Sequence, residues 1–141
     1  MAEIKKIIAE IEKYAPPELS YGCVEKGLYD NSGFLIDGGE FQTENVVFAL
    51  DLCGGAVEKA LECGAKLIVT HHPAIYKPIK TVGGTIANCL KNGISVYSAH
   101  LNLDITRGGI DDELARICGA KKAKAQVAEE IKGGFGFGRY F

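Results

Sequence analysis

The sequence of 141 residues has no apolar run that approaches the roughly 20 residues of a membrane-spanning helix. Residues 1–6 also lack the charged-then-apolar order of a secretory signal peptide. We therefore expect a cytoplasmic protein with no membrane partner. The formal net charge of −2 provides no excess of positive charge for binding a polyanion, so we expect no nucleic-acid partner either.

The cysteines lack the spacing of a disulfide framework or of a structural zinc knuckle. Their number is odd, they are widely separated, and no Cys-x-x-Cys pair occurs among them. The sequence therefore predicts free thiols that pack in the interior as small hydrophobic side chains. These residues are Cys23, Cys53, Cys63, Cys89 and Cys118.

Length and composition are those of one ordinary globular domain. Apolar residues make up 47% and charged residues 24%, which excludes a disordered, collagen-like or coiled-coil chain. A chain of this length can bury roughly two thirds of its unfolded surface in one core, and a second complete domain does not fit. We therefore expect residues 1–141 to form a single α/β domain.

Hydrophobic periodicity predicts alternating strands and helices. Isoleucines at positions 4, 7, 8 and 11 define one helix face, and Pro16 and Pro17 end that helix. Apolar, β-branched strands are predicted at 46–50, 67–69 and 94–97, and glycine-capped helices at 56–63, 85–92 and 111–118. Strands joined through helices pair in parallel. The fold class is thus α/β, with a mixed, largely parallel sheet flanked by helices. Residues 133–141 alternate small and aromatic side chains, as a strand does, and need a pairing partner.

All three histidines follow two of these strands. His71 and His72 come directly after strand 67–69, and His100 follows strand 94–97, with Asp104 four residues further on in an expected loop. The carboxyl ends of parallel strands form the ligand-binding edge of such a sheet. Imidazole and carboxylate without a nearby thiolate suit zinc, iron or manganese. Adjacent histidines on an extended backbone point to opposite sides, so this pair suits two ions, or one ion and a substrate.

Simpler roles exist for the same residues. His72 and His100 can donate hydrogen bonds to backbone carbonyls, and Asp104 can cap a turn. Asp51 ends strand 46–50 on the same edge, where it is expected to orient a histidine or to be a further carboxylate ligand. Asp30 is expected to be a turn former.

Five segments in order resemble the Nif-three-like family, the GTP cyclohydrolase 1 type 2 homologues. They are Tyr-Asp-Asn-Ser-Gly at 29–33, Ile-Val-Thr-His-His-Pro at 68–73, Ser-Ala-His-Leu-Asn-Leu-Asp at 98–104, Gly-Gly-Ile-Asp-Asp-Glu-Leu-Ala at 108–115, and Gly-Phe-Gly-Arg at 136–139. The resemblance implies a site for up to two divalent metal ions with His71, His72 and Asp104 as ligands. It places His100 close by, as a residue that supports the ligands or as a further ligand.

The resemblance also implies ligands that these residues do not contain. The family has a His-x-x-x-Glu element in a C-terminal half that follows the Gly-Arg strand, whereas no histidine follows His100 here. The sequence is therefore expected to correspond to the N-terminal half alone, with the C-terminal half absent. A fragment, a site completed by a separate chain and a degenerate site all remain open, and we expect little GTP ring opening from these residues by themselves.

Two function classes remain. One is a metal-dependent hydrolase acting on a small, phosphorylated or nucleotide-like substrate, for which the resemblance implies opening of the guanine ring of GTP at C8 with loss of formate. The other is a non-catalytic, metal-binding interaction or regulatory module, which a closed coordination shell would favour. Self-association to a homo-oligomer fits both classes.

Overall fold

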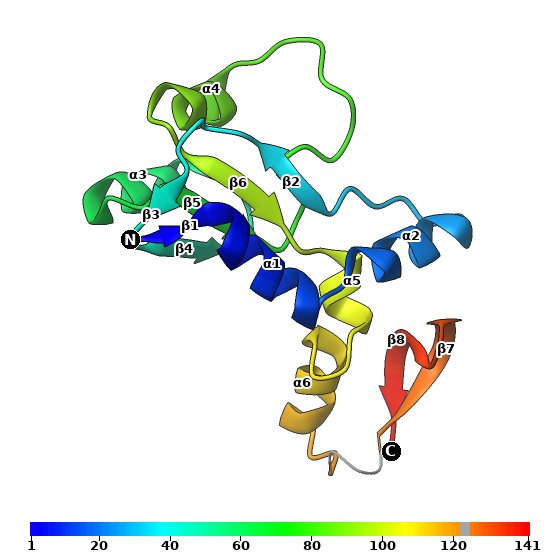
Figure 1. The fold of residues 1–141 in the computed structure, drawn as a ribbon. Coiled ribbons are helices and arrows are strands. Elements are labelled where there is room, and N and C mark those ends of the chain that lie inside the picture. Colours follow the sequence, from blue (N-terminus) through cyan, green and yellow to red (C-terminus); the bar gives the residue numbers. More distant parts are fainter. Residues whose placement is uncertain (122–124) are drawn as a thin grey trace.

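A four-stranded mixed sheet forms the centre of the computed structural model, which describes residues 1–121 and 125–141. The strand order is β2 (Gly33–Ile36), β6 (Ser95–Ser98), β5 (Leu67–Thr70) and β4 (Val46–Ala49), as Figure 1 shows. β4, β5 and β6 are parallel, whereas β2 pairs antiparallel with β6. The predicted mixed, largely parallel sheet is confirmed, and the three predicted strands are its parallel members.

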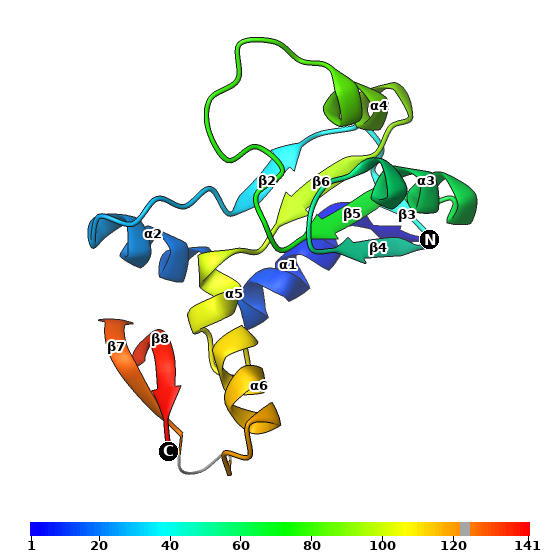
Figure 2. The ribbon, with the colours of Figure 1, turned by 180° about the vertical axis from the view of Figure 1, so that it is seen from behind.

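Helices cover both faces of this sheet. On one face, α3 (Gly54–Cys63) and α4 (Gly84–Lys91) pack on side chains such as Ile68 and Val96 (Figure 2). On the other face, α1 (Ile4–Tyr14) packs on Leu67, Val69 and Tyr97. Successive residues of β5 alternate between the two cores, and all four are buried. This is why Leu67, Ile68 and Val69 of β5 are all apolar.

Two helices lie where the sequence predicted none. Pro16 and Pro17 end α1, as predicted, but Pro17 is also the first residue of α2 (Pro17–Glu25). Proline fits the first turn of a helix because its missing N–H has no partner there in any case. The second is the short α5 (Leu101–Ile105), which is followed by α6 (Ile110–Ile117).

The C-terminal residues form a hairpin of β7 (Gln126–Lys132) and β8 (Phe135–Tyr140). The predicted aromatic strand therefore finds its pairing partner within the chain. Arg139 holds this hairpin to the start of α6, because its guanidinium contacts the carboxylate of Asp112 and is only 4% exposed. Phe135 and Phe137 of β8 pack against a small core that α2 and α5 share with the hairpin. A further two-stranded sheet joins β1 (Ala2–Glu3) to β3 (Gln42–Thr43).

The cysteines are free, as predicted, but their burial was predicted wrongly for some of them. Cys23 and Cys89 are buried, whereas Cys53 and Cys118 are exposed. Burial raises the pKa of the Cys23 thiol to about 11. Cys53 precedes α3 and Cys118 follows α6, and element ends of this kind lie at the surface.

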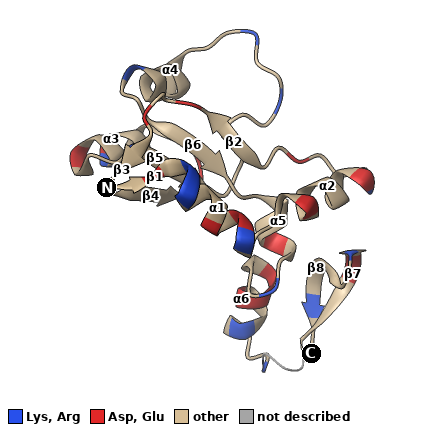
Figure 3. Cartoon of the chain, viewed as in Figure 1, with Lys and Arg blue, Asp and Glu red and all other residues tan. Residues whose placement is uncertain are grey.

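Charged residues of both signs are interspersed along the described chain (Figure 3). Among the helices of the described residues, none combines the length and the apolar character needed to cross a bilayer.

Candidate metal centre

The parallel strands bring the predicted histidine segments to one edge of the sheet. Thr70 at the end of β5 lies opposite Ser98 at the end of β6. The pairing of β5 with β6 extends beyond the strands, since the amide of Ala99 donates to the Thr70 carbonyl at 2.9 Å. His71 and His100 therefore emerge side by side, with ring centroids 5.4 Å apart.

Asp104 lies on a helix and not in a loop, which corrects the sequence prediction. His100 is the N-terminal cap residue of α5, and the amide of Asp104 donates to the His100 carbonyl at 3.1 Å. Because residues four apart lie on the same side of a helix, Asp104 and His100 face the same region. One ligand atom each from His71, His100 and Asp104 lies within 4.8 Å of the others.

His72 lies next to this three-residue cluster without belonging to it. Its ring centroid is 5.1 Å from that of His71 and 5.9 Å from that of His100. Its Nδ1 lies 2.7 Å from Oδ1 of Asp51, and both side chains are about half exposed. Asp51 thus has the position that an orienting carboxylate would have. The structure places His71 with Asp104 and His100, and His72 with Asp51.

Each histidine uses the same ring nitrogen for a protein hydrogen bond. Nδ1 of His71 lies 3.0 Å from the Ala99 carbonyl, and Nδ1 of His100 lies 2.7 Å from the Asp30 carboxylate. Carbonyl and ionised carboxylate oxygens only accept hydrogen bonds, so Nδ1 is the donor in each pair and Nε2 is the ring nitrogen left to face a metal ion. Metal-binding histidines in proteins show this arrangement.

The spacing of the groups also fits a bound ion. Nε2 of His71 and Oδ1 of Asp104 are 3.5 Å apart. Two ligands at about 2.0 to 2.2 Å from a tetrahedral zinc ion would be separated by about 3.4 Å. The donor set therefore fits a divalent cation between these two side chains.

Asp30 has a larger role than the turn former that the sequence predicted. Its side chain is fully buried, and it accepts hydrogen bonds from His100, Ser20 and Ser32. Burial alone would raise the pKa of Asp30, but these three hydrogen bonds and the charge of His100 lower it to about 2. Asp30 therefore stays ionised and fixes the His100 ring.

Asp104 has the opposite electrostatic environment. Burial raises the pKa of its carboxyl, and the nearby His71 and His100 offset this only in part. A buried carboxylate whose charge is incompletely compensated is stabilised by an added cation. Burial thus raises the pKa of Asp104 in the chain alone, and a metal ion bound beside it would lower this pKa.

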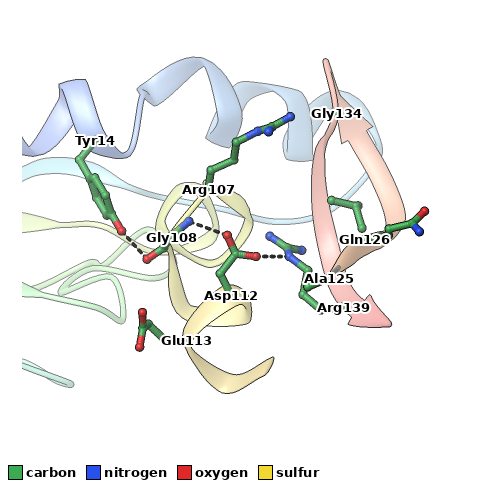
Figure 4. A pocket seen from close by; sticks show the side chains of 10 residues that line it. Tyr14, Arg107, Gly108, Asp112, Glu113, Ala125, Gln126, Gly134 and Arg139 are labelled. Carbon is green, nitrogen blue, oxygen red and sulfur yellow. Dashed lines mark hydrogen bonds and ion pairs between the residues drawn. The ribbon is translucent and has the colours of Figure 1, made fainter. Parts of the chain in front are cut away.

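Two hollows lie near these elements, and one of them reaches the histidine cluster. An apolar groove of about 580 Å³ between α1 and β4 includes His71, Val69 and Phe48 in its lining. A cavity of about 640 Å³ lies instead between α6 and the β7–β8 hairpin, lined by Tyr14, Arg107 and Arg139 among others (Figure 4). None of the three histidines lines this second cavity.

The fold and the site together define an α/β protein that gathers histidines and a carboxylate at the carboxyl edge of parallel strands. The chain belongs to the DUF34/NIF3 family, whose model, described as Duf34/NIF3 (NGG1p interacting factor 3), matches residues 2–140.

Curated relatives of this chain are considerably longer. A GTP cyclohydrolase 1 type 2 homolog of Clostridium perfringens is 33% identical over 143 residues, covering 97% of this chain and 52% of the relative. NIF3-like protein 1 of Drosophila melanogaster is 33% identical over 121 residues, covering 81% of this chain and 39% of the relative. The chain thus spans about half or less of the length of these two relatives.

Solved structures share the fold. A Bacillus cereus protein related to NIF3 superposes with a TM-score of 0.78 at 30% identity, covering 90% of this chain and 35% of that one. Reduced HcgD from Methanocaldococcus jannaschii gives a TM-score of 0.73 at 32% identity, covering 89% and 50% respectively.

Proposed function

We propose that His71, His100 and Asp104 bind a divalent metal ion, zinc, iron or manganese, in the centre of a hydrolase that acts on a nucleotide-like substrate. The observation that carries the proposal is the cluster of three ligand atoms within 4.8 Å, in which both imidazoles hold their Nδ1 in a protein hydrogen bond. His100 is thus proposed as a ligand. The resemblance alone implied either a further ligand or a residue that supports the ligands. His72 is the candidate for a second ion or for a substrate contact.

The three ligands grouped among the described residues match the number that a catalytic centre commonly takes from the protein. Catalytic metal sites commonly keep three protein ligands and leave a position for water or substrate, whereas structural sites are closed. A bound divalent ion supplies a more acidic water and polarises the group under attack. Within that centre His71, His100 and Asp104 would hold the ion. Asp30 fixes the ring of His100. Asp51 orients His72, because it contacts Nδ1 and leaves Nε2 facing away from the Asp51 carboxylate.

The reaction class rests on the names of the relatives and on the family resemblance. Relatives about twice as long carry the name GTP cyclohydrolase 1 type 2 homolog. The activity of the whole protein, including further ligands from a His-x-x-x-Glu element, is therefore a proposal for a longer polypeptide. Release of formate from GTP is the reaction that the resemblance implies.

The reaction is tested by joining residues 1–141 to the part of the Clostridium perfringens relative that this chain does not match. Formate release from GTP is measured with zinc, iron(II) or manganese. We expect turnover in the joined protein, a loss of more than about 100-fold on His71→Ala, and little activity from the 141 residues alone. Metal binding without turnover in the joined protein would instead identify a non-catalytic, metal-binding module.

A further inference from the structure

Two tyrosines outside the metal cluster form an aromatic pair beside it. The rings of Tyr29 and Tyr76 have centroids 4.8 Å apart in an edge-on contact with an interplanar angle of 68°. Tyr76 also lies 6.4 Å from the His100 ring, at 88°. The pair therefore borders the cluster on the side of His100, and no step of the proposed hydrolysis uses it.

Both tyrosines are about half exposed to water. Tyr29 is 49% exposed and Tyr76 is 45% exposed. Large aromatic side chains bury a substantial area when they find a partner, and they prefer to meet other rings. A flat ligand that covered these rings would remove that apolar surface from water.

The backbone on which the two rings stand is held in place. Nδ2 of Asn31 donates to the Ile75 carbonyl at 2.5 Å, which ties the segment of Tyr29 to the segment of Tyr76. Ile75 packs against the core under β5 and β6, and the neighbouring Ala74 donates its amide to Ser98 at 3.1 Å. Asp30, next to Tyr29, holds His100. The backbone segments that carry the two rings are thus tied to one another and to the group that holds His100 before any ligand arrives, which lowers the entropic cost of binding.

We propose that Tyr29 and Tyr76 bind the planar aromatic ring of the substrate and position it against the metal cluster. The proposal rests on the proposed function and makes it more specific, because it names a planar heterocycle as the part of the substrate recognised here. The centroid of the Tyr76 ring is 6.4 Å from that of the His100 ring, so a planar ring that contacts Tyr76 lies beside the His100 side of the cluster. Stacking of this kind accepts any flat ring. The tyrosines are therefore expected to distinguish planar from non-planar ligands, and other contacts would distinguish one base from another.

Guanosine tests the pair because it has the ring without the charge of a phosphate, and ribose serves as the non-planar comparison. Binding is measured by calorimetry on metal-free and on zinc-loaded protein. We expect guanosine to bind and ribose not to bind, with affinity for guanosine about 10-fold lower in Tyr76→Leu and in Tyr29→Leu. Tyr76→Phe keeps the ring and is expected to stay within about 2-fold. Tyr140→Leu, a tyrosine of comparable exposure on β8, is the matched control and is expected to change nothing.

The metal-free titration separates this inference from the proposed function. If the chain bound no zinc but still lost guanosine affinity in Tyr76→Leu, the proposed function would fail and the aromatic site would stand. Absence of guanosine binding in both states, or equal binding by Tyr76→Leu and the unaltered protein, overturns the inference. Should a leucine variant not fold, proton shifts of the Tyr29 and Tyr76 rings on adding guanosine to the unaltered protein decide the question, and unmoved ring signals count against it.

Discussion

Replacement of Asp104 by asparagine is expected to lower the affinity of the chain for zinc by more than about 100-fold. Loss of a group that only supports a ligand costs about 10- to 100-fold, and Asp104 is the single carboxylate in the three-residue cluster. The neutral amide oxygen offers the ion no charge. Competition against a chromophoric chelator measures the change.

The same variant is expected to fold. Burial raises the pKa of Asp104, so its charge is a cost to the metal-free protein, and a neutral side chain of equal size removes that cost. Asp37→Asn is the matched control, since Asp37 is a carboxylate that accepts a turn hydrogen bond from Gly39 away from the cluster. Unchanged zinc affinity in Asp104→Asn, or equal losses in both variants, would remove Asp104 from the site.

Replacement of Asp30 by asparagine is expected to weaken both the fold and the metal site. The pKa of Asp30 is lowered from 3.8 to about 2, which corresponds to about 2 kcal/mol of folding free energy when the carboxyl is ionised. Because the folded-state pKa is lowered, this stability is present above pH 4 and is lost as the pH falls from about 4 to about 2. Zinc affinity is expected to fall by about 10- to 100-fold, since the His100 ring loses its carboxylate.

Urea unfolding of Asp30→Asn and of the unaltered chain at several pH values checks this expectation. The difference in unfolding free energy should be present at pH 7 and should shrink as the pH is lowered below 4. A difference that stayed constant with pH would show that Asp30 acts through packing and not through its charge.

The sheet and most of its helices could be predicted from the sequence because each element is buried in a regular pattern, on both faces for a central strand and on one face for a helix. β5 is buried on both faces, so its residues are all apolar apart from the terminal Thr70. Helices α3 and α4 carry an apolar face and stop near a glycine. The prediction missed α2 because a proline pair was taken as an end only, although Pro17 also begins the next helix. It missed α5 because five residues are too few to show a helical period.

The candidate site was predictable where it follows strand ends and was not where it depends on tertiary contacts. His71, His100 and Asp104 follow strands whose pairing is readable from apolar runs, so their closeness could be expected, whereas the resemblance implied His72 as the second histidine ligand and His100 as its neighbour. Asp30 is 70 residues from His100 and stands in a turn-forming Asp-Asn-Ser-Gly segment, so local chemistry pointed to a turn. Asp30 reaches His100 because β2 pairs antiparallel with β6 at the sheet edge. This pairing brings Ser32 and Asp30 to the end of β6.

The most direct test of the metal centre is an anomalous difference map from a crystal of the chain soaked in zinc, collected at the zinc absorption edge. We predict one peak about 2.0 to 2.2 Å from Nε2 of His71, Nε2 of His100 and a carboxylate oxygen of Asp104. A peak bound by other side chains with these three groups empty, or no peak at the histidine edge at a saturating zinc concentration, would contradict the account.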